Sequence, residues 1–295
     1  MWNQIIEQRR KSLGDLEVGR VLPAAASGMV GPFIFFDHIG PVDLPAGLPR
    51  SADVRPHPHI GLSTLTYLFD GQIMHRDSLA SSQSIDPGAV NWMVAGRGIT
   101  HSERFERARA QGDHLHGIQA WVALPDEEEE TSPSFTHHAA GSLPVSEERG
   151  VWMRLIAGEA FGMQSPVRTH SPLAYAHLRL ARGASVPVPA ELRERALYVV
   201  SGALSGAGQT LLPGQMGVLE PRNAPAITAT EDSLVMLVAG EPVGPRYIDW
   251  NFVSSSADRI AQAKSDWRAG RIRLPDADDA EFIPLPEIDA TPRRL

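Results

Sequence analysis

Glycine and proline recur along the whole chain and divide it into short segments rich in branched and aromatic residues. The 26 glycines and 24 prolines are spread over the sequence. One segment, Leu62–Phe69, ends at the turn pair Asp70-Gly71, and another, Gly117–Leu124, ends at Pro125. Short segments between turn signals are typical of the strands of a sandwich or a barrel. The pattern therefore predicts an all-β protein.

The second half of the chain repeats part of the first. Leu65–Gly71 resembles Ala196–Gly202, and a Pro-Gly turn follows each segment after a similar interval, at 87–88 and at 213–214. A length of 295 residues fits one large β domain or two smaller ones. The repeat favours two copies of one β unit.

An acidic run at 126–130 is the natural place to divide the chain. Blocks of like charge are usually solvated, so we interpret this run as an exposed connector. We therefore expect one domain at 1–130, a second at 131–250, and a C-terminal segment at 251–295 that packs on the barrels.

One helix is predicted in the C-terminal segment. Ser255 or Ser256 can cap its N-terminus, and Gly270 can end it. Apolar residues recur between them at helical spacing: Ile260, Ala263 and Trp267. We expect this face to pack on a barrel, and the residues from Leu274 onward to lie extended on the surface.

Composition and charge argue against several classes of protein. The net charge of −8 disfavours a nucleic-acid backbone as the main partner, because phosphate binding needs a basic surface. The sequence contains no run of about 18 apolar residues, so no transmembrane helix is predicted. The polar N-terminal residues do not resemble a signal peptide. The chain has no cysteine, so any metal site must use histidine and carboxylate. We expect a cytoplasmic protein.

Two pairs of residues carry the pattern of metal ligands. His57 and His59 are two apart in a predicted strand, so their side chains point the same way with Cα atoms about 6.6 Å apart. His101 and Glu103 repeat this arrangement after the turn run at 95–98. Two such pairs facing each other inside a barrel would offer three imidazoles and one carboxylate, a set that suits Fe, Mn, Ni, Cu or Zn.

Other histidines compete for this role. His114 and His116 have the same spacing and could replace the second pair, although no carboxylate accompanies them. If this pair binds no metal, His116 is expected to form a hydrogen bond near the site or in the core. His38 and His75 each lie close to an aspartate and are expected in turns or in support of the ligands. The remaining histidines are expected to be structural: His137, His138, His170 and His177. Trp92 and Met93 fit a pocket wall or a plain core equally well.

At these residues the chain resembles the pirin family of the cupin superfamily. The matching stretches are Phe36-Asp37-His38, His57–Gly61, Thr64–Leu68, His75–Ser78, Pro87–Met93, Ala95–Glu103, Trp250–Ser256, Asp266-Trp267 and Phe282–Pro286. The resemblance covers nearly the whole chain. It implies two cupin barrels (a bicupin of double-stranded β-helix or jelly-roll type) with a short C-terminal helix.

The resemblance also implies a ligand set. One Fe(II) would lie in the N-terminal barrel, held by the positions that match His57, His59, His101 and Glu103, and the second barrel would hold no metal. Many cupins and pirins carry a glutamate four residues after the second histidine, where this chain has Ser63. Because pirins take their carboxylate ligand from the second pair, we expect the metal site to survive this departure, with altered hydrogen bonding near it.

Two functions follow from the resemblance. Several pirins resemble quercetin 2,3-dioxygenases, which open a flavonol ring with O2 and release carbon monoxide. In that reading the substrate is a small aromatic molecule and Glu103 is the general base. In the alternative, the iron centre is a redox sensor in a regulatory protein that binds a transcription factor or a metabolic enzyme. A purely structural metal is a third interpretation. We favour the enzyme, acting as a monomer without direct contact to nucleic acid or membrane.

Overall fold

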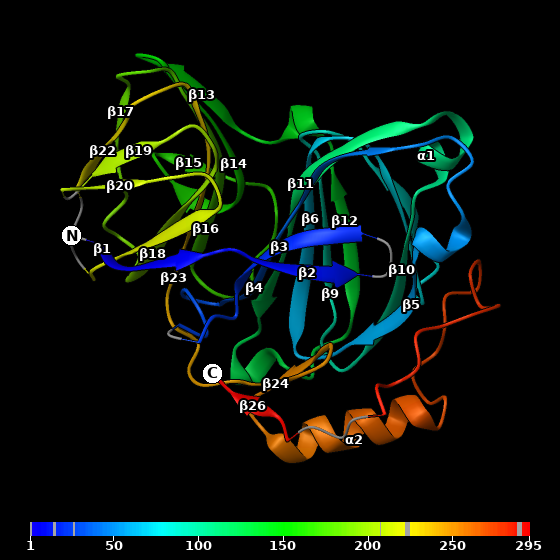
Figure 1. Cartoon of the computed structure of the whole chain (residues 1–295). Helices are drawn as coiled ribbons and strands as arrows, with labels where there is room; N and C mark the ends of the chain where they lie inside the picture. The colour runs from blue at the N-terminus through cyan, green and yellow to red at the C-terminus, as the bar shows by residue number, and fades with distance from the viewer. Residues whose placement is uncertain (1, 14–15, 26, 207, 222–224, 288–290) are drawn as a thin grey trace. The chain divides into compact units, whose positions relative to one another are not determined.

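A computed structural model shows the chain at residues 2–13, 16–25, 27–206, 208–221, 225–287 and 291–295. Strands form nearly all the regular structure in these residues, which confirms the all-β prediction (Figure 1). The described α-helices are α1 (Glu106–Gln111) and α2 (Ala257–Arg268). Short 3-10 turns also occur, at Arg50–Ala52, Asp126–Glu128 and Ala140–Ser142. Within the part of the chain that the structure describes, neither α-helix has the length and hydrophobicity of a membrane-spanning segment.

The residues group into two compact units that are not continuous in sequence. Unit 1 comprises Met1–Arg10, Gly19–His38 and Gly141–Pro242, and unit 2 comprises Lys11–Val18, Ile39–Ala140 and Val243–Leu295. The sequence prediction instead drew single boundaries after residues 130 and 250. The difference arises because the first strand, β1 (Trp2–Glu7), pairs with β21 (Gln215–Leu219) and so completes a sheet edge built from the second half of the chain (Figure 1).

Unit 1 consists of two facing sheets. One has the order β1-β21-β18-β23-β16-β14-β13 with β15 beside β14, and the other has the order β17-β22-β19-β20. Their apolar side chains meet in one core, to which Leu197 contributes from the first sheet and Leu204 from the second. The remaining strands are β13 (Val145–Glu148), β14 (Val151–Ala160), β15 (Met163–Gln164), β16 (Leu173–Leu180), β17 (Ser185–Pro187), β18 (Glu194–Ser201), β19 (Leu204–Gly206), β20 (Gln209–Leu211), β22 (Ala226–Ala229) and β23 (Ser233–Gly240).

Unit 2 has the same two-sheet plan. Its sheets have the orders β12-β9-β6-β11-β4-β3-β2 and β5-β10-β7-β8, and a small sheet, β25-β24-β26, follows. The strands are β2 (Arg9–Leu13), β3 (Leu16–Leu22), β4 (Phe33–Leu44), β5 (Val54–His59), β6 (Leu62–Asp70), β7 (Ile73–Asp77), β8 (Ser82–Ile85), β9 (Val90–Val94), β10 (Ile99–Arg104), β11 (Asp113–Ala123), β12 (Ser134–His138), β24 (Tyr247–Asp249), β25 (Phe252–Ser254) and β26 (Arg293–Arg294). Strands β2, β3 and β4 have residues in both units.

The repeat seen in the sequence corresponds to equivalent strands. The repeated segments form β6 and β18, which are interior strands of the large sheets. The turn glycine after each strand donates its backbone N–H to an equivalent carbonyl, Gly88 to Leu68 at 2.8 Å and Gly214 to Val199 at 2.9 Å. Two copies of one β unit therefore account for both halves of the chain.

The predicted C-terminal helix is confirmed as α2. Ser256 caps it by accepting a hydrogen bond from the backbone N–H of Arg259. The three apolar positions of its predicted face are buried and pack with Ile60 and Phe252 of the same unit. The short helix α1 was not predicted, because six residues are too few to show a helical period.

The acidic run at 126–130 is not merely a solvated connector, so that prediction was wrong in part. Glu129 is buried and lies 3.0 Å from the guanidinium of Arg246, which is also buried. Its carboxylate also accepts hydrogen bonds from Ser254 and Ser255. A buried arginine needs a counter-charge, and the acidic run supplies it, which anchors the C-terminal segment to unit 2.

Gly61 connects β5 to β6 in a conformation that other residues adopt at a cost. Its φ is +67°, and a Cβ there would overlap the carbonyl oxygen of Val253. We expect Gly61→Ala to lower the free energy of unfolding by about 1–3 kcal/mol in urea denaturation. Gly47→Ala is the matched control, because Gly47 also has a positive φ, +77°, with nothing near its Cβ position. Equal losses in the two variants would contradict a role for the Val253 overlap.

Candidate metal centre

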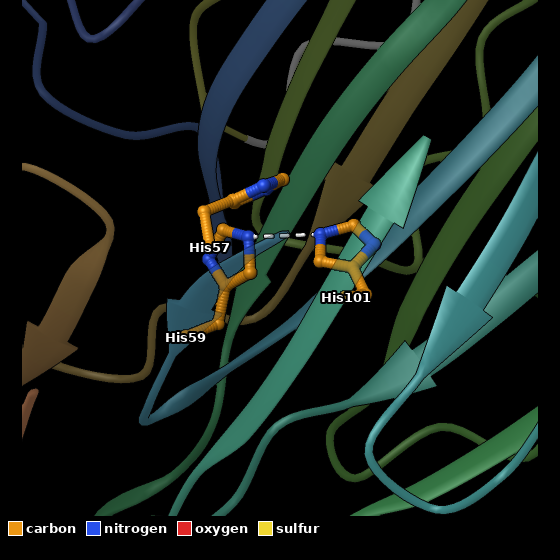
Figure 2. A group of neighbouring side chains, drawn as sticks. All are labelled: His57, His59 and His101. Atoms are coloured by element: carbon orange, nitrogen blue, oxygen red, sulfur yellow. Dashed lines mark hydrogen bonds between the residues drawn. The ribbon is translucent and has the colours of Figure 1, made fainter. Parts of the chain in front are cut away.

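Strands β5 and β10 bring three imidazoles to one point inside unit 2. The two strands are antiparallel, with His57 opposite His101 and His59 opposite Ile99. One ring nitrogen from each of His57, His59 and His101 lies within 4.8 Å of the other two, and Figure 2 shows the rings turned toward one another. All three side chains are buried, with relative exposures of 7%, 1% and 1%. The structure thus brings the three predicted histidines together.

The outer ring nitrogens of these histidines all have partners. Nδ1 of His57 lies 2.9 Å from the carbonyl oxygen of Arg55, and Nδ1 of His59 lies 3.1 Å from that of Asn251. A carbonyl can only accept, so each of these Nδ1 atoms carries the proton, and Nε2 of a neutral ring is left with a free lone pair. Nδ1 of His101 lies 3.3 Å from Nδ1 of His75. Hydrogen bonds of this kind hold metal-binding imidazoles in place.

Electrostatics keep the three imidazoles neutral. Burial lowers the pKa of His57 to about 4. Burial, reinforced by the neighbouring imidazoles, also holds the pKa values of His59 and His101 well below the ordinary value. Metal ligands must be neutral imidazoles, so the ligand atoms are available at neutral pH without loss of a proton.

Glu103 does not belong to the cluster of ligand atoms. That cluster comprises the ring nitrogens of the three histidines, which lie within 4.8 Å of one another. The pairing of β10 with β5 is irregular between His101 and Glu103, and this bulge shifts Glu103 to a position opposite Val54. Burial raises the pKa of Glu103 to about 7, although a hydrogen bond from Thr66 (3.4 Å) opposes the shift. The role of Glu103 as a ligand therefore stays a prediction.

This donor set fits a divalent metal ion. Nε2 of His59 lies 3.1 Å from Nε2 of His101, at hydrogen-bond distance. His59 carries its proton on Nδ1, so a proton in this contact comes from His101, and a cation can take its place by binding both nitrogens. The buried carboxyl of Glu103, two residues from His101, has no cationic partner among the described residues. A cation at the centre would bind the imidazoles and offset this carboxylate, and imidazole suits Zn, Cu, Fe and Ni alike.

The competing histidine pair does not join the site. His114 is bonded to Asp43 at 2.7 Å on the surface, and the ring of His116 contacts Phe69. Nor do the histidines expected to be structural belong to the described cluster: His137 contacts Asn91, and His177 contacts Trp152.

Residues that the sequence left open also have definite places. His38 contacts Tyr198 within unit 1, at 2.9 Å, and Trp92 and Met93 are buried core residues. Ser63, where the family resemblance led us to expect glutamate, is buried in β6. The edge of Trp121 packs against His59, with ring centroids 5.0 Å apart, and no motif in the sequence indicated this contact.

The C-terminal tail fixes the outer face of β10. Ser102 and Arg104 alternate with the inward-facing His101 and Glu103, and both donate to Asp278, Ser102 at 2.6 Å and Arg104 at 2.7 Å. The backbone N–H of Ile283 donates to Pro56 of β5 at 2.8 Å. The tail was predicted to lie extended on the surface, but these contacts bury Asp278 and tie the tail to both ligand-bearing strands.

Comparison with known proteins identifies the two halves of the chain. Residues 15–122 match the family model described as Pirin, and residues 175–273 match the Pirin C-terminal cupin domain. These matches confirm the predicted pair of cupin domains.

Similar proteins cover the chain almost completely. A pirin-like protein from Caulobacter vibrioides is 58% identical over 288 residues, which are 97% of this chain and 100% of that protein. The crystal structure of a quercetin 2,3-dioxygenase from Acinetobacter baumannii matches with a TM-score of 0.89 and 33% identity, over 99% of this chain and 97% of that one. The bacterial pirin YhhW from Escherichia coli, solved in complex with nickel(II), shares the fold at a TM-score of 0.65 and 19% identity, over 81% of this chain and 99% of its own.

Proposed function

The chain belongs to the pirin family, and from this premise we propose that it is a metal-dependent oxidoreductase that opens the ring of a flavonol, or of a similar enolisable aromatic molecule, with O2. The observation that carries the proposal is the convergence of three buried, neutral imidazoles on one point. The similarity of nearly the whole chain to a quercetin 2,3-dioxygenase supports the choice of reaction.

The metal would be held by His57, His59 and His101, with Glu103 as the fourth ligand. We propose Fe(II), although the same donors accept Mn, Ni, Cu or Zn, and a bacterial pirin of the same fold binds nickel(II). A bound metal supplies Lewis acidity toward the ionised hydroxyl of the substrate and a place for it beside O2. Elemental analysis of the protein purified from its own host identifies the metal.

Glu103 is the group that we propose as the general base. Without a cation beside it, burial raises the pKa of Glu103 to about 7. A bound metal ion would lower this pKa and favour the carboxylate, which is the form that accepts a proton. The Thr66 hydroxyl lies 2.7 Å from Oε1 of Gln119 and 3.4 Å from Oε1 of Glu103, so the carboxyl belongs to a short polar row on the inner wall. In this arrangement Glu103 takes the proton of the substrate hydroxyl.

The test is an aerobic assay of iron-loaded protein with quercetin, followed by the loss of flavonol absorbance. We expect Glu103→Gln to reduce kcat/KM by about 10²–10⁴-fold, the usual contribution of a general base, in protein with its metal content measured. Glu106→Gln is the matched control, because Glu106 is exposed on α1 and pairs with Arg76. Metal-loaded wild type that consumes quercetin no faster than Glu103→Gln would refute the proposal.

One observation favours a second candidate, an iron-dependent redox sensor that binds a transcription factor or a metabolic enzyme. His59 is bonded through Nδ1 to the carbonyl of Asn251, which directly precedes β25, so a change of charge at the metal acts on the C-terminal segment. A pull-down that compares Fe(II) and Fe(III) protein tests this candidate, and partners that do not depend on the oxidation state would contradict it.

A further inference from the structure

A histidine and an aspartate stand directly behind the metal centre on the neighbouring strand. Strand β7 pairs with β10 on the side away from β5, with Asp77 opposite His101 and His75 opposite Glu103. Residues opposite each other in an antiparallel pair point to the same face. His75 and Asp77 therefore continue the row of the proposed ligands, and both are buried.

Asp77 is fixed by its two carboxylate oxygens. Oδ1 accepts the backbone N–H groups of Leu79 at 2.9 Å and Ser81 at 3.0 Å. Oδ2 lies 2.9 Å from Nε2 of His75. Because Oδ1 is occupied by the turn, only Oδ2 faces the imidazole. An ionised carboxylate can only accept, so Nε2 of His75 carries a proton.

His75 is held from two further sides. Its ring stacks on Phe135, with centroids 4.4 Å apart and planes 16° from parallel. Its Nδ1 lies 3.3 Å from Nδ1 of His101. When His101 binds a metal through Nε2, its proton stands on Nδ1, and His75 with its proton on Nε2 alone offers the lone pair that accepts it. In that arrangement Nε2 of His101, which faces the other imidazoles, is unprotonated.

We propose that His75 and Asp77 are positioning residues that hold His101 in the tautomer whose Nε2 can bind the metal. The inference rests on the metal site of the proposed function and adds to it a chain of two hydrogen bonds, Asp77 to His75 to His101. Imidazole ligands to metals are commonly oriented by a carboxylate or carbonyl on their other nitrogen. His57 and His59 use carbonyls for this purpose, whereas His101 relies on a second imidazole backed by a carboxylate.

The substitution Asp77→Asn tests whether Asp77 controls the tautomer of His101 or only fills space in the core. The introduced amide has the shape of the carboxylate, and its oxygen stays with the two backbone N–H groups of the turn. Its NH2 group then points at Nε2 of His75 and forces that nitrogen to accept. The proton of His75 moves to Nδ1, where it meets the proton of His101, and the proton of His101 is displaced to the nitrogen that faces the metal. The side-chain volume is unchanged, but the tautomer is wrong.

The experiment is a competition titration of the metal-free protein with Ni(II), together with the absorption spectrum of the Co(II)-loaded protein. We expect Asp77→Asn to weaken Ni(II) binding by about 10–100-fold, the usual effect of losing such a partner, and to change the Co(II) spectrum. Asp43→Asn is the matched control, because Asp43 forms the corresponding pair with His114 on the surface of the same unit. It should leave both readouts unchanged.

A second variant keeps the inference testable if Asp77→Asn does not fold. His75→Phe keeps an aromatic ring against Phe135 but removes the acceptor for His101, and we expect the same loss of affinity. Wild-type affinity and spectrum in either folded variant would overturn the inference. His101→Ala separates the metal site from the positioning role of His75 and Asp77. If His101→Ala binds Ni(II) as tightly as the wild type, the proposed metal site is wrong. If His101→Ala loses the metal while Asp77→Asn and His75→Phe keep it, only the role of His75 and Asp77 is wrong.

Discussion

Replacing His101 by alanine is expected to weaken metal binding strongly, because it removes one of three converging imidazoles. The His101 ring is close to both other imidazoles, with centroids 4.4 Å from His57 and 5.1 Å from His59. His57 and His59 lie on one strand, and His101 supplies the imidazole from the facing strand β10. Without it, both remaining imidazoles come from β5, and only the proposed ligand Glu103 is left on β10.

The size of this effect follows from the number of ligands. Apparent binding free energies of about 10–16 kcal/mol are typical of four-ligand protein sites for zinc. Removal of one ligand should therefore cost roughly 3–4 kcal/mol, or about 10²–10³-fold in Kd. Titration of metal-free protein with Ni(II) measures the change. His114→Ala is the control, since His114 belongs to the competing pair and is exposed. Equal affinities of His101→Ala and wild type would contradict the assignment.

The largest effect on stability is expected from Arg104→Met. Arg104 is only 2% exposed, and its guanidinium contacts three acidic side chains: Asp53 at 3.4 Å, Asp278 at 2.7 Å and Glu281 at 3.1 Å. The substitution leaves Asp278 with Ser102 and the more distant Arg50 as partners. Removal of one member of a buried ion pair costs about 3–5 kcal/mol, because the other charge remains buried.

Urea denaturation of metal-free protein measures this loss without a contribution from ligand binding. The matched control is Arg273→Met, which removes an exposed arginine paired with Asp276, and an exposed pair contributes about 1 kcal/mol or less. We also expect Arg104→Met to expose the C-terminal tail to proteolysis, since Asp278 loses its strongest contact. Equal stabilities of the two variants would show that the buried network does not hold the tail.

The local parts of the fold and site were accessible from the sequence. The spacing of His57 and His59 on a strand, repeated at His101, is a short-range pattern, and the structure brings these side chains together. The helix α2 was also predictable, since its cap and its apolar face lie within one segment. Patterns of this kind depend only on the period of a strand or helix.

The parts that could not be predicted depend on partners far along the chain. Nothing in Trp2–Glu7 indicates that it pairs with β21 and so joins unit 1. The burial of Glu129 depends on Arg246. The bulge between His101 and Glu103 is a matter of strand register, which sequence alternation alone does not reveal. His75 and Asp77 had the spacing of a same-face pair, but only the pairing of β7 with β10 places them behind His101.

An anomalous difference map from crystals of the Ni(II)-loaded protein tests the metal centre most directly. We expect one peak, located between the Nε2 atoms of His57, His59 and His101. A map with no peak at this point, or with a peak at His114 and His116 instead, would show that the three histidines do not form a metal site.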